Sequence, residues 1–438
     1  MARDKGFERY WREIAPGRWT RDFDPLEKCL HFSALASPHL VQWTVSFGAI
    51  LPEITFSVEE IKAAWLVLRH THPHIACTIQ DTGYCYQVPT EEDLEKWLDE
   101  TVHVDNSGKP GRELAMSLEP PSSSRVVFLP DRREIFFQIR HELIDGVGST
   151  KLLDWFLKTL SEGGKPIPKF GDEASRLSPS IAQLMDAENP PPAVLEEGRK
   201  IGERYLSNPA VGLKMESYEA GLPNPGASRL LEHDFSENET SAIIEACKRE
   251  GYTVTQVTSA AAAAAMLEHS GQETGKFTSF FIADLRDKLH KPPMVGLYVT
   301  PGLGVIPLTR STPFSELVKA AKKEYEWKHN KNNVACHGPM AQMIQDALSM
   351  AMANEMVLPA GINISSLGVV EKYLKEPVED FWINLVVATH LHGGFFVYTV
   401  KNRLRFSFCY NEGYFTETSI KEYMDMTVKH LQKGLNIN

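Results

Sequence analysis

Several features that would define a specialised class of protein are absent from this chain of 438 residues. No run approaches the ~20 apolar residues that a membrane-spanning helix needs. The opening segment, MARDKGFERYWREIAPGRW, lacks the apolar core of a secretory signal peptide. The six cysteines form no CxxC pair and have no histidine at zinc-ligand spacing. The sequence therefore predicts a cytoplasmic protein with reduced thiols and no membrane or disulfide framework.

Basic residues are also fewer than acidic residues. There are 46 Lys plus Arg against 57 Asp plus Glu, which gives a formal net charge of −11. This acidic balance argues against nucleic acid as a partner, because phosphate binding requires a concentrated basic face. Any anionic ligand must therefore find a local basic patch. The length suffices for two or three domain cores of ~100–200 residues each.

The first third of the chain reads as helices alternating with hairpins. Ser57 and Glu60 have the spacing of a capping box, followed by apolar residues at helical period, so a helix is predicted over 57–69. A hairpin is predicted over 75–88. A second hairpin, 125–129 with 134–140, leads through a glycine-containing loop into a helix over 149–160. Strand, tight loop and helix in this order can hold a polar side chain at a fixed point.

Proline and glycine become frequent after this region, which predicts a long crossover between two lobes. The predicted division is an N-terminal lobe over 1–162, a linker over 163–228 with a helix near 194–206, and a C-terminal lobe over 229–438. The six alanines at 260–265 indicate close packing of a helix against a sheet. The predicted fold class is α/β (α+β). In the second lobe, strands are predicted over 229–235, 276–284 and 395–410, and helices over 237–250, 253–269, 314–329 and 418–433.

The segment RHELIDG, from Arg140 to Gly146, carries the strongest chemical signal. His141 and Asp145 lie four residues apart at the end of a predicted strand. Histidine is the side chain best suited to accept a proton near neutral pH. The pair alone is equally compatible with a solvated histidine and a loop-capping aspartate.

The surrounding sequence resembles the superfamily of chloramphenicol acetyltransferase, plant BAHD acyltransferases, polyketide-associated acyltransferases and nonribosomal-peptide condensation domains. Its hallmark HHxxxDG is matched with Arg140 in place of the first histidine. A helix ending in a His-Pro turn (64–76), the alanine-rich helix and the segment ADLR (283–286) agree in order. NISSLGVVEKYL (363–374) most resembles the fungal trichothecene 15-O-acetyltransferase branch, while the missing DFGWG motif counts against a plant BAHD enzyme.

The resemblance implies two chloramphenicol-acetyltransferase-like lobes, each a mixed sheet flanked by helices, with an active-site tunnel between them. It implies acyl transfer from a thioester to a hydroxyl or amine, with His141 as general base. Asp145 would pair with Arg286 and brace the loop. Gly146 would let the thioester arm approach His141.

Candidates for the remaining roles follow from position in the family pattern. Asn363, Ser365 and Ser366 are candidates for donating to the oxyanion, although a Ser-Ser-Leu-Gly segment can also be a simple turn. His390 and His392 would share one face of a strand, and one of them is expected to line the acceptor pocket. No metal is expected, because no carboxylate or thiol completes a ligand set around the clustered histidines.

A basic stretch interrupts the acidic chain at Lys319, Lys322 and Lys323, and continues to Lys328 and Lys331. It is a candidate for binding the phosphates of coenzyme A. The alternative is a solvated helix face balanced by Glu324 and Glu326.

Three functions remain open from the sequence. The first is an acyl-CoA-dependent O-acyltransferase, a monomer without tightly bound cofactor, that moves an acyl group, expected to be acetyl, to a hydroxyl of a small secondary metabolite. The second is a free-standing condensation-like enzyme that uses a carrier-protein thioester or catalyses a cyclisation. The third is a non-catalytic binder, against which the intact HxxxDG motif and Arg286 argue.

Overall fold

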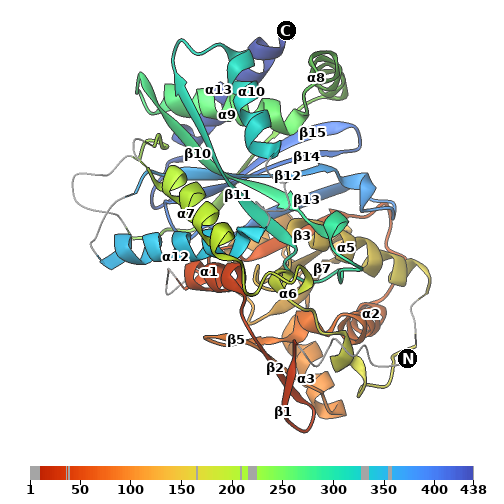
Figure 1. The fold of residues 1–438 in the computed structure, drawn as a ribbon. Helices are drawn as coiled ribbons and strands as arrows, with labels where there is room; N and C mark the ends of the chain where they lie inside the picture. Colours follow the sequence, from red (N-terminus) through yellow and green to blue (C-terminus); the bar gives the residue numbers. More distant parts are fainter. Residues whose placement is uncertain are drawn as a thin grey trace.

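The computed structural model describes residues 10–35, 37, 40–163, 166–207, 210–215, 224–326, 335–353 and 358–437. The chain forms two lobes, each built on a mixed sheet flanked by helices, with a small third sheet at the N-terminal end (Figure 1). The α/β prediction is confirmed. Within the described residues, no helix is long and apolar enough to cross a membrane.

The N-terminal lobe is built on a five-stranded sheet. Only the β6–β7 pair is parallel. One face packs on the helices α2 and α5, and the other face packs on α4. The strand order is β13 (Asp380–Leu385), β3 (Val45–Ile50), β8 (Glu134–Ile139), β7 (Ser124–Leu129) and β6 (Val102–Val104), and the helices are α2 (Val58–Thr71), α4 (Gly111–Ser117) and α5 (Gly146–Ser161).

The edge strand β13 comes from the far end of the chain and inserts beside β3. Trp382 on β13 is fully buried against Phe136, and its indole N–H donates to Glu134 at 2.7 Å. A strand from the predicted C-terminal lobe thus completes the N-terminal sheet. Local patterns could not predict this, because a strand does not record in its own residues which sheet it joins.

The C-terminal lobe is built on a six-stranded sheet with two parallel pairs, β10–β12 and β12–β14. One face is covered by α8, α9, α10 and α13. The other face meets α7, α12 and the helix α1, which the N-terminal lobe contributes (Figure 1). The strand order is β11 (Val299–Thr309), β10 (Thr274–Asp284), β12 (Gly361–Val369), β14 (His392–Val400), β15 (Arg403–Asn411) and β9 (Ser228–Asp234), and the helices are α1 (Pro25–Ala34), α7 (Pro192–Leu206), α8 (Glu237–Glu250), α9 (Val254–His269), α10 (Phe314–Glu326), α12 (His337–Ala353) and α13 (Glu417–Leu435).

The remaining elements are small. The third sheet has the order β1 (Arg12–Ala15), β2 (Arg18–Asp22), β5 (Gly83–Gln87) and β4 (Thr78–Ile79), and two further helices are α3 (Glu91–Thr101) and α6 (Ile181–Leu184). The β4–β5 pair is the predicted hairpin over 75–88.

Several predicted elements are confirmed. Helix α2 begins with the capping box of Ser57 and Glu60, and the alanines of α9 pack between α10, α13 and the sheet. The predicted strand over 395–410 is instead two strands, β14 and β15. They are joined by a turn at Lys401 and Asn402, whose φ angles of 48° and 61° are those of a tight hairpin turn. The end of the helix predicted over 314–329 lies outside the described residues.

Candidate active site

The motif segment connects strand β8 to helix α5, and the local hydrogen bonds fix its shape. The backbone N–H of Arg140 donates to Ser123 at 2.9 Å and ends the sheet pairing. His141 is half-buried, and its Nδ1 lies 2.8 Å from the carbonyl oxygen of Ile144. A carbonyl only accepts, so the hydrogen bond assigns the proton to Nδ1 and leaves the lone pair on Nε2. Nε2 is therefore the nitrogen of His141 that can accept a proton.

The side chain of Asp145 is held by hydrogen bonds and an ion pair that join the two lobes. Its side chain caps α5 by accepting from the Gly148 N–H at 2.8 Å, and it accepts from the Tyr298 N–H at 2.7 Å. Arg286 Nη1 donates to the same carboxylate at 2.9 Å, so the ion pair that the resemblance implied is present. Asp145 is only 1% exposed, and both of its carboxylate oxygens accept from a backbone N–H or from Arg286. The arrangement suits a brace rather than a group that contacts substrate.

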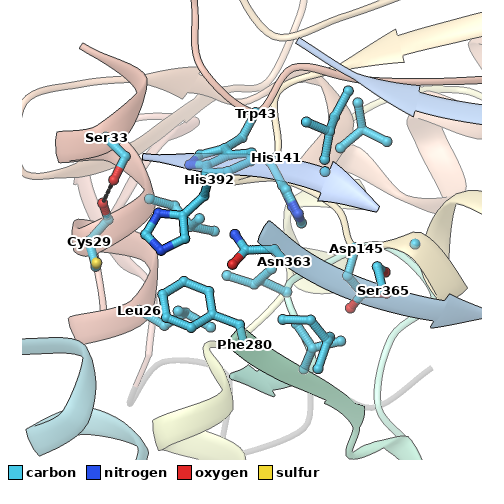
Figure 2. Close-up of a pocket in the computed structure, with 18 of the residues that line it drawn as sticks. Leu26, Cys29, Ser33, Trp43, His141, Asp145, Phe280, Asn363, Ser365 and His392 are labelled. Carbon is cyan, nitrogen blue, oxygen red and sulfur yellow. Dashed lines mark hydrogen bonds between the residues drawn. The ribbon is translucent and has the colours of Figure 1, made fainter. Parts of the chain in front are cut away.

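A cavity of about 1100 Å³, counting its open mouth, extends from His141 between the lobes. Most of its lining side chains are apolar. Figure 2 shows the rings of His141 and His392 and the amide of Asn363 directed toward one shared space. The described lining residues are Leu26, Cys29, Leu30, Ser33, Trp43, Val45, His141, Asp145, Gly146, Phe280, Ile282, Leu297, Val299, Ala341, Ile344, Leu348, Asn363, Ser365, Ile383, Leu385, His392, Gly394 and Phe396.

Strand β12 separates the three oxyanion candidates by its two-residue alternation. Asn363 and Ser365 line the cavity, whereas Ser366 lies on the opposite face and shares a hydrogen bond of 2.8 Å with Thr255 of α9. In the described part of the protein, Asn363 Oδ1 is buried without a hydrogen-bond partner. Two of the three candidates therefore remain within reach of a substrate in the cavity.

The two candidate histidines of the acceptor side also separate. His392 lines the cavity, stacks on Phe280 with ring centroids 5.1 Å apart, and lies with Nε2 3.4 Å from the Tyr205 hydroxyl. Burial lowers the pKa of His392 to about 4, with a smaller contribution from His390. It is therefore neutral at physiological pH. His390 precedes β14, packs beside Tyr414 and is not among the lining residues.

Close packing requires glycine at two positions in the first turn of α5, Gly146 at the end of the motif segment and Gly148. A Cβ on Gly146 would lie 2.9 Å from Leu367 Cδ2, so this glycine lines the cavity and also accommodates β12. A Cβ on Gly148 would lie 2.8 Å from the Met294 carbonyl oxygen and 3.0 Å from Arg286 Nη2. Gly148 was not among the predicted site residues, and its place two residues after Gly146 is the one sequence signal for it.

A second group that the sequence analysis missed surrounds Glu142. Arg140 donates to both oxygens of this carboxylate, and His31 Nδ1 lies 3.2 Å from Oε1. Burial alone would raise the pKa of Glu142, but the hydrogen bonds from His31 and Arg140 outweigh it and lower the pKa below its usual value. The residue that replaces the family's first histidine thus has a fixed ionic partner within its own loop.

The three lysines proposed for coenzyme A lie on α10. This helix packs on α9 and β11 through Leu317 and other apolar residues. Lys319 pairs with Glu316 at 2.9 Å, and none of the three lines the cavity. Glu324, proposed as part of the balancing acidic face, is instead buried and pairs with Arg204 of α7. Lys328 and Lys331 lie outside the described residues, and the role of the basic stretch stays a prediction.

One group of potential metal ligands is present among the described residues. His70 lies near Asp172 and Glu173. The guanidinium of Arg176 lies within 3.2 Å of both ring nitrogens of His70 and 3.1 Å from the Asp172 carboxylate. Because the Arg176 guanidinium already occupies this position, we interpret the group as an ion-pair cluster and not as a metal site.

The fold is shared with acetyltransferases and condensation domains that are built on two such lobes. A family model described as phthiocerol/phthiodiolone dimycocerosyl transferase C-terminus matches residues 224–323. The structure is similar to that of trichothecene 15-O-acetyltransferase TRI3 from Fusarium sporotrichioides, with a TM-score of 0.80, 18% identity and coverage of 97% of this chain and 98% of that one. It is also similar to the first condensation domain of the calcium-dependent antibiotic synthetase, with a TM-score of 0.67, 13% identity and coverage of 95% and 97%.

A more particular relative comes from sequence. The chain is 27% identical over 463 residues to the O-acetyltransferase pigM of Monascus ruber, covering 98% of this chain and 87% of that protein. The resemblance to the acyltransferase superfamily and its fungal acetyltransferases is thereby confirmed.

Proposed function

We propose that this protein is an acyltransferase that moves an acyl group, acetyl in the first instance, from the thioester of coenzyme A to a hydroxyl of a small secondary metabolite. The observation that carries the proposal is the geometry of His141. Its Nδ1–H is held by the Ile144 carbonyl, and its ring lines a large apolar cavity between the lobes. The named activity of pigM as an O-acetyltransferase supports the same reaction class.

The reaction follows from one proton-accepting nitrogen. Nε2 of His141 takes the proton of the acceptor hydroxyl as the oxygen attacks the thioester carbonyl carbon. The carbon–sulfur bond of the resulting tetrahedral intermediate then breaks, and the imidazolium returns the proton to the departing thiolate. The hydrogen bond at Nδ1 keeps the ring in the tautomer that both steps need.

The oxyanion requires a donor on the other side of the cavity. Asn363 and Ser365 are the candidates, because both lie on the face of β12 that lines the cavity. Donors of this kind contribute about 3–4 kcal/mol to transition-state stabilisation in well-characterised enzymes. The acceptor is an apolar molecule, because the cavity that would hold it is lined mainly by aliphatic side chains. Helices α1 and α12 and strands β10 and β11 contribute many of them.

The test is turnover of acetyl-CoA by purified protein with a panel of apolar hydroxylated acceptors, followed by thiol release and mass spectrometry of the product. His141→Ala should lower kcat by roughly 10²–10⁴-fold, the contribution of a general base. A matched control is His103→Ala, which removes a half-buried histidine of β6 outside the cavity. Unchanged turnover in His141→Ala would refute the assigned base.

A second candidate keeps the fold and changes the donor. The similarity to condensation domains and the position of the α10 lysines away from the cavity favour an acyl chain delivered by a carrier protein. A ligand that binds only the native state must raise the melting temperature. A rise with acetyl-CoA supports the first candidate, whereas no rise with acetyl-CoA and a rise with loaded carrier protein supports the second.

A further inference from the structure

Glu142 lies inside the protein, one residue after the proposed base. It is 1% exposed and does not line the cavity. Its carboxylate accepts hydrogen bonds from Arg140 and from His31 Nδ1, and its backbone carbonyl accepts from the Tyr84 hydroxyl at 2.6 Å. Both carboxylate oxygens and the backbone carbonyl oxygen of Glu142 therefore accept hydrogen bonds, and the charge of the carboxylate is compensated by Arg140.

These contacts make Glu142 one of two anchors of the loop 140–145. At the other end, Asp145 is held by Arg286 and caps α5. Between the anchors, the Leu143 N–H donates to the Arg140 carbonyl at 2.9 Å, and the Ile144 carbonyl accepts from His141. The position of the Ile144 carbonyl, and with it the ring of His141, depends on both ends of the loop.

The first anchor also reaches the wall of the cavity. His31 lies on α1, and its neighbours Leu30 and Ser33 on that helix are lining residues. The ring of His31 packs on Phe23 with centroids 5.0 Å apart, which fixes the imidazole that faces Glu142. A single buried carboxylate therefore connects the loop of the base with the helix that lines the acceptor space.

We propose that Glu142 is a positioning residue for His141. By holding the loop 140–145 against α1, it keeps the Ile144 carbonyl where it selects the Nδ1–H tautomer and directs Nε2 to the cavity. The kinetic consequence rests on the proposed acyltransferase function, whereas the effect on the His141 ring does not. A displacement of about 1 Å in such a group costs on the order of 10²-fold in rate.

The kinetic test is Glu142→Gln, which keeps the shape and removes the charge. We expect kcat to fall by about 10- to 100-fold, the usual cost of losing a supporting partner, with KM within about twofold because no substrate contact is lost. The matched control is Glu134→Gln, equally buried on β8, where Glu134 accepts from Gly111 and Trp382 and contacts nothing in the loop. The control should lose stability but keep kcat. Equal kcat values in the two variants would refute the proposal.

A second measurement reads the ring directly in the free protein. With ¹⁵N-histidine labelling, the resonances of His141 are assigned by their loss in His141→Gln. The wild type should show one tautomer with the proton on Nδ1, and Glu142→Gln should show a mixture. An unchanged tautomer in the variant overturns the proposal. If the wild type transfers no acyl group, the proposed function fails, but this measurement still decides the role of Glu142.

If Glu142→Gln does not fold, two milder variants test the same proposal. Tyr84→Phe removes only the hydrogen bond to the Glu142 carbonyl, and Glu142→Asp keeps the charge while shortening the reach. Both should give smaller shifts of the same kind in kcat and in the His141 tautomer. Native values of both readouts in these two variants would refute the proposal as well.

Discussion

Asp145→Asn tests whether the bridge between the lobes holds the motif in place. The substitution is isosteric, but it removes the charge opposite Arg286, whose side chain is only 6% exposed. Breaking a buried ion pair by neutralising one partner costs about 3–5 kcal/mol. The single amide oxygen can also serve only one of the two backbone donors, Gly148 and Tyr298, and an unsatisfied buried N–H costs about 1–3 kcal/mol. The cost of the broken ion pair and the cost of the unsatisfied N–H are not additive, because the structure relaxes around both lost interactions at the same side chain.

Asp284 reduces the loss, since its carboxylate also accepts from Arg286 Nη1 at 3.0 Å. We therefore expect Asp145→Asn to lower the free energy of unfolding by about 3–5 kcal/mol in total, a large part of a typical 5–15 kcal/mol. Urea denaturation followed by tryptophan fluorescence measures it. Asp284→Asn is the matched control, with a more exposed carboxylate on the same arginine, and it should cost less than about 1.5 kcal/mol.

A double-mutant cycle with Arg286→Met separates the pair from its surroundings. Neutralising both partners should cost less than the sum of the single changes by about 1–3 kcal/mol, because neither Asp145 nor Arg286 is then left as a buried charge without the other. Additive costs, or equal losses in Asp145→Asn and Asp284→Asn, would refute the view that Asp145 and Arg286 form the bridge.

Three further predictions concern the cavity and its surroundings. Gly148→Ala places a Cβ against the Met294 carbonyl and should lower the free energy of unfolding by about 1–3 kcal/mol in thermal or urea melts, and a loss under 0.5 kcal/mol would show that the backbone yields freely. Ser365→Ala should lower kcat, whereas Ser366→Ala, on the opposite face of β12, should not; equal steady-state effects would contradict the assigned faces. The folded-state pKa of His392 is about 4, below its unfolded value of 6.5, so the unfolded chain binds the proton first as the pH falls and stability is lost between pH 6.5 and 4. His392→Gln should remove about 2 kcal/mol of the loss between pH 7 and pH 5 in urea titrations, and an unchanged pH slope would contradict the neutral state of this half-buried ring.

Local rules in the sequence determined much of the framework. Ser57 and Glu60 begin α2, because a hydroxyl and a carboxylate three residues apart satisfy each other's backbone donors. The alanines of α9 specify close packing wherever that helix lies. The resemblance carried by the motif from Arg140 to Gly146 and by the segment 283–286 predicted the ion pair of Asp145 with Arg286, which is present, whereas His141 as the base stays a proposal.

The tertiary structure decided which of the candidates share a space. Ser365 and Ser366 are chemically alike, and only the face of β12 separates the one in the cavity from the one that contacts α9. Strand β13 joins the N-terminal sheet from the far end of the chain, and Glu142 finds His31 more than a hundred residues away in sequence. Capping and periodicity act within one or two turns of chain, so the sequence determines them directly. Contacts between distant segments depend on how whole sheets and helices pack, and that packing is a property of all the elements together.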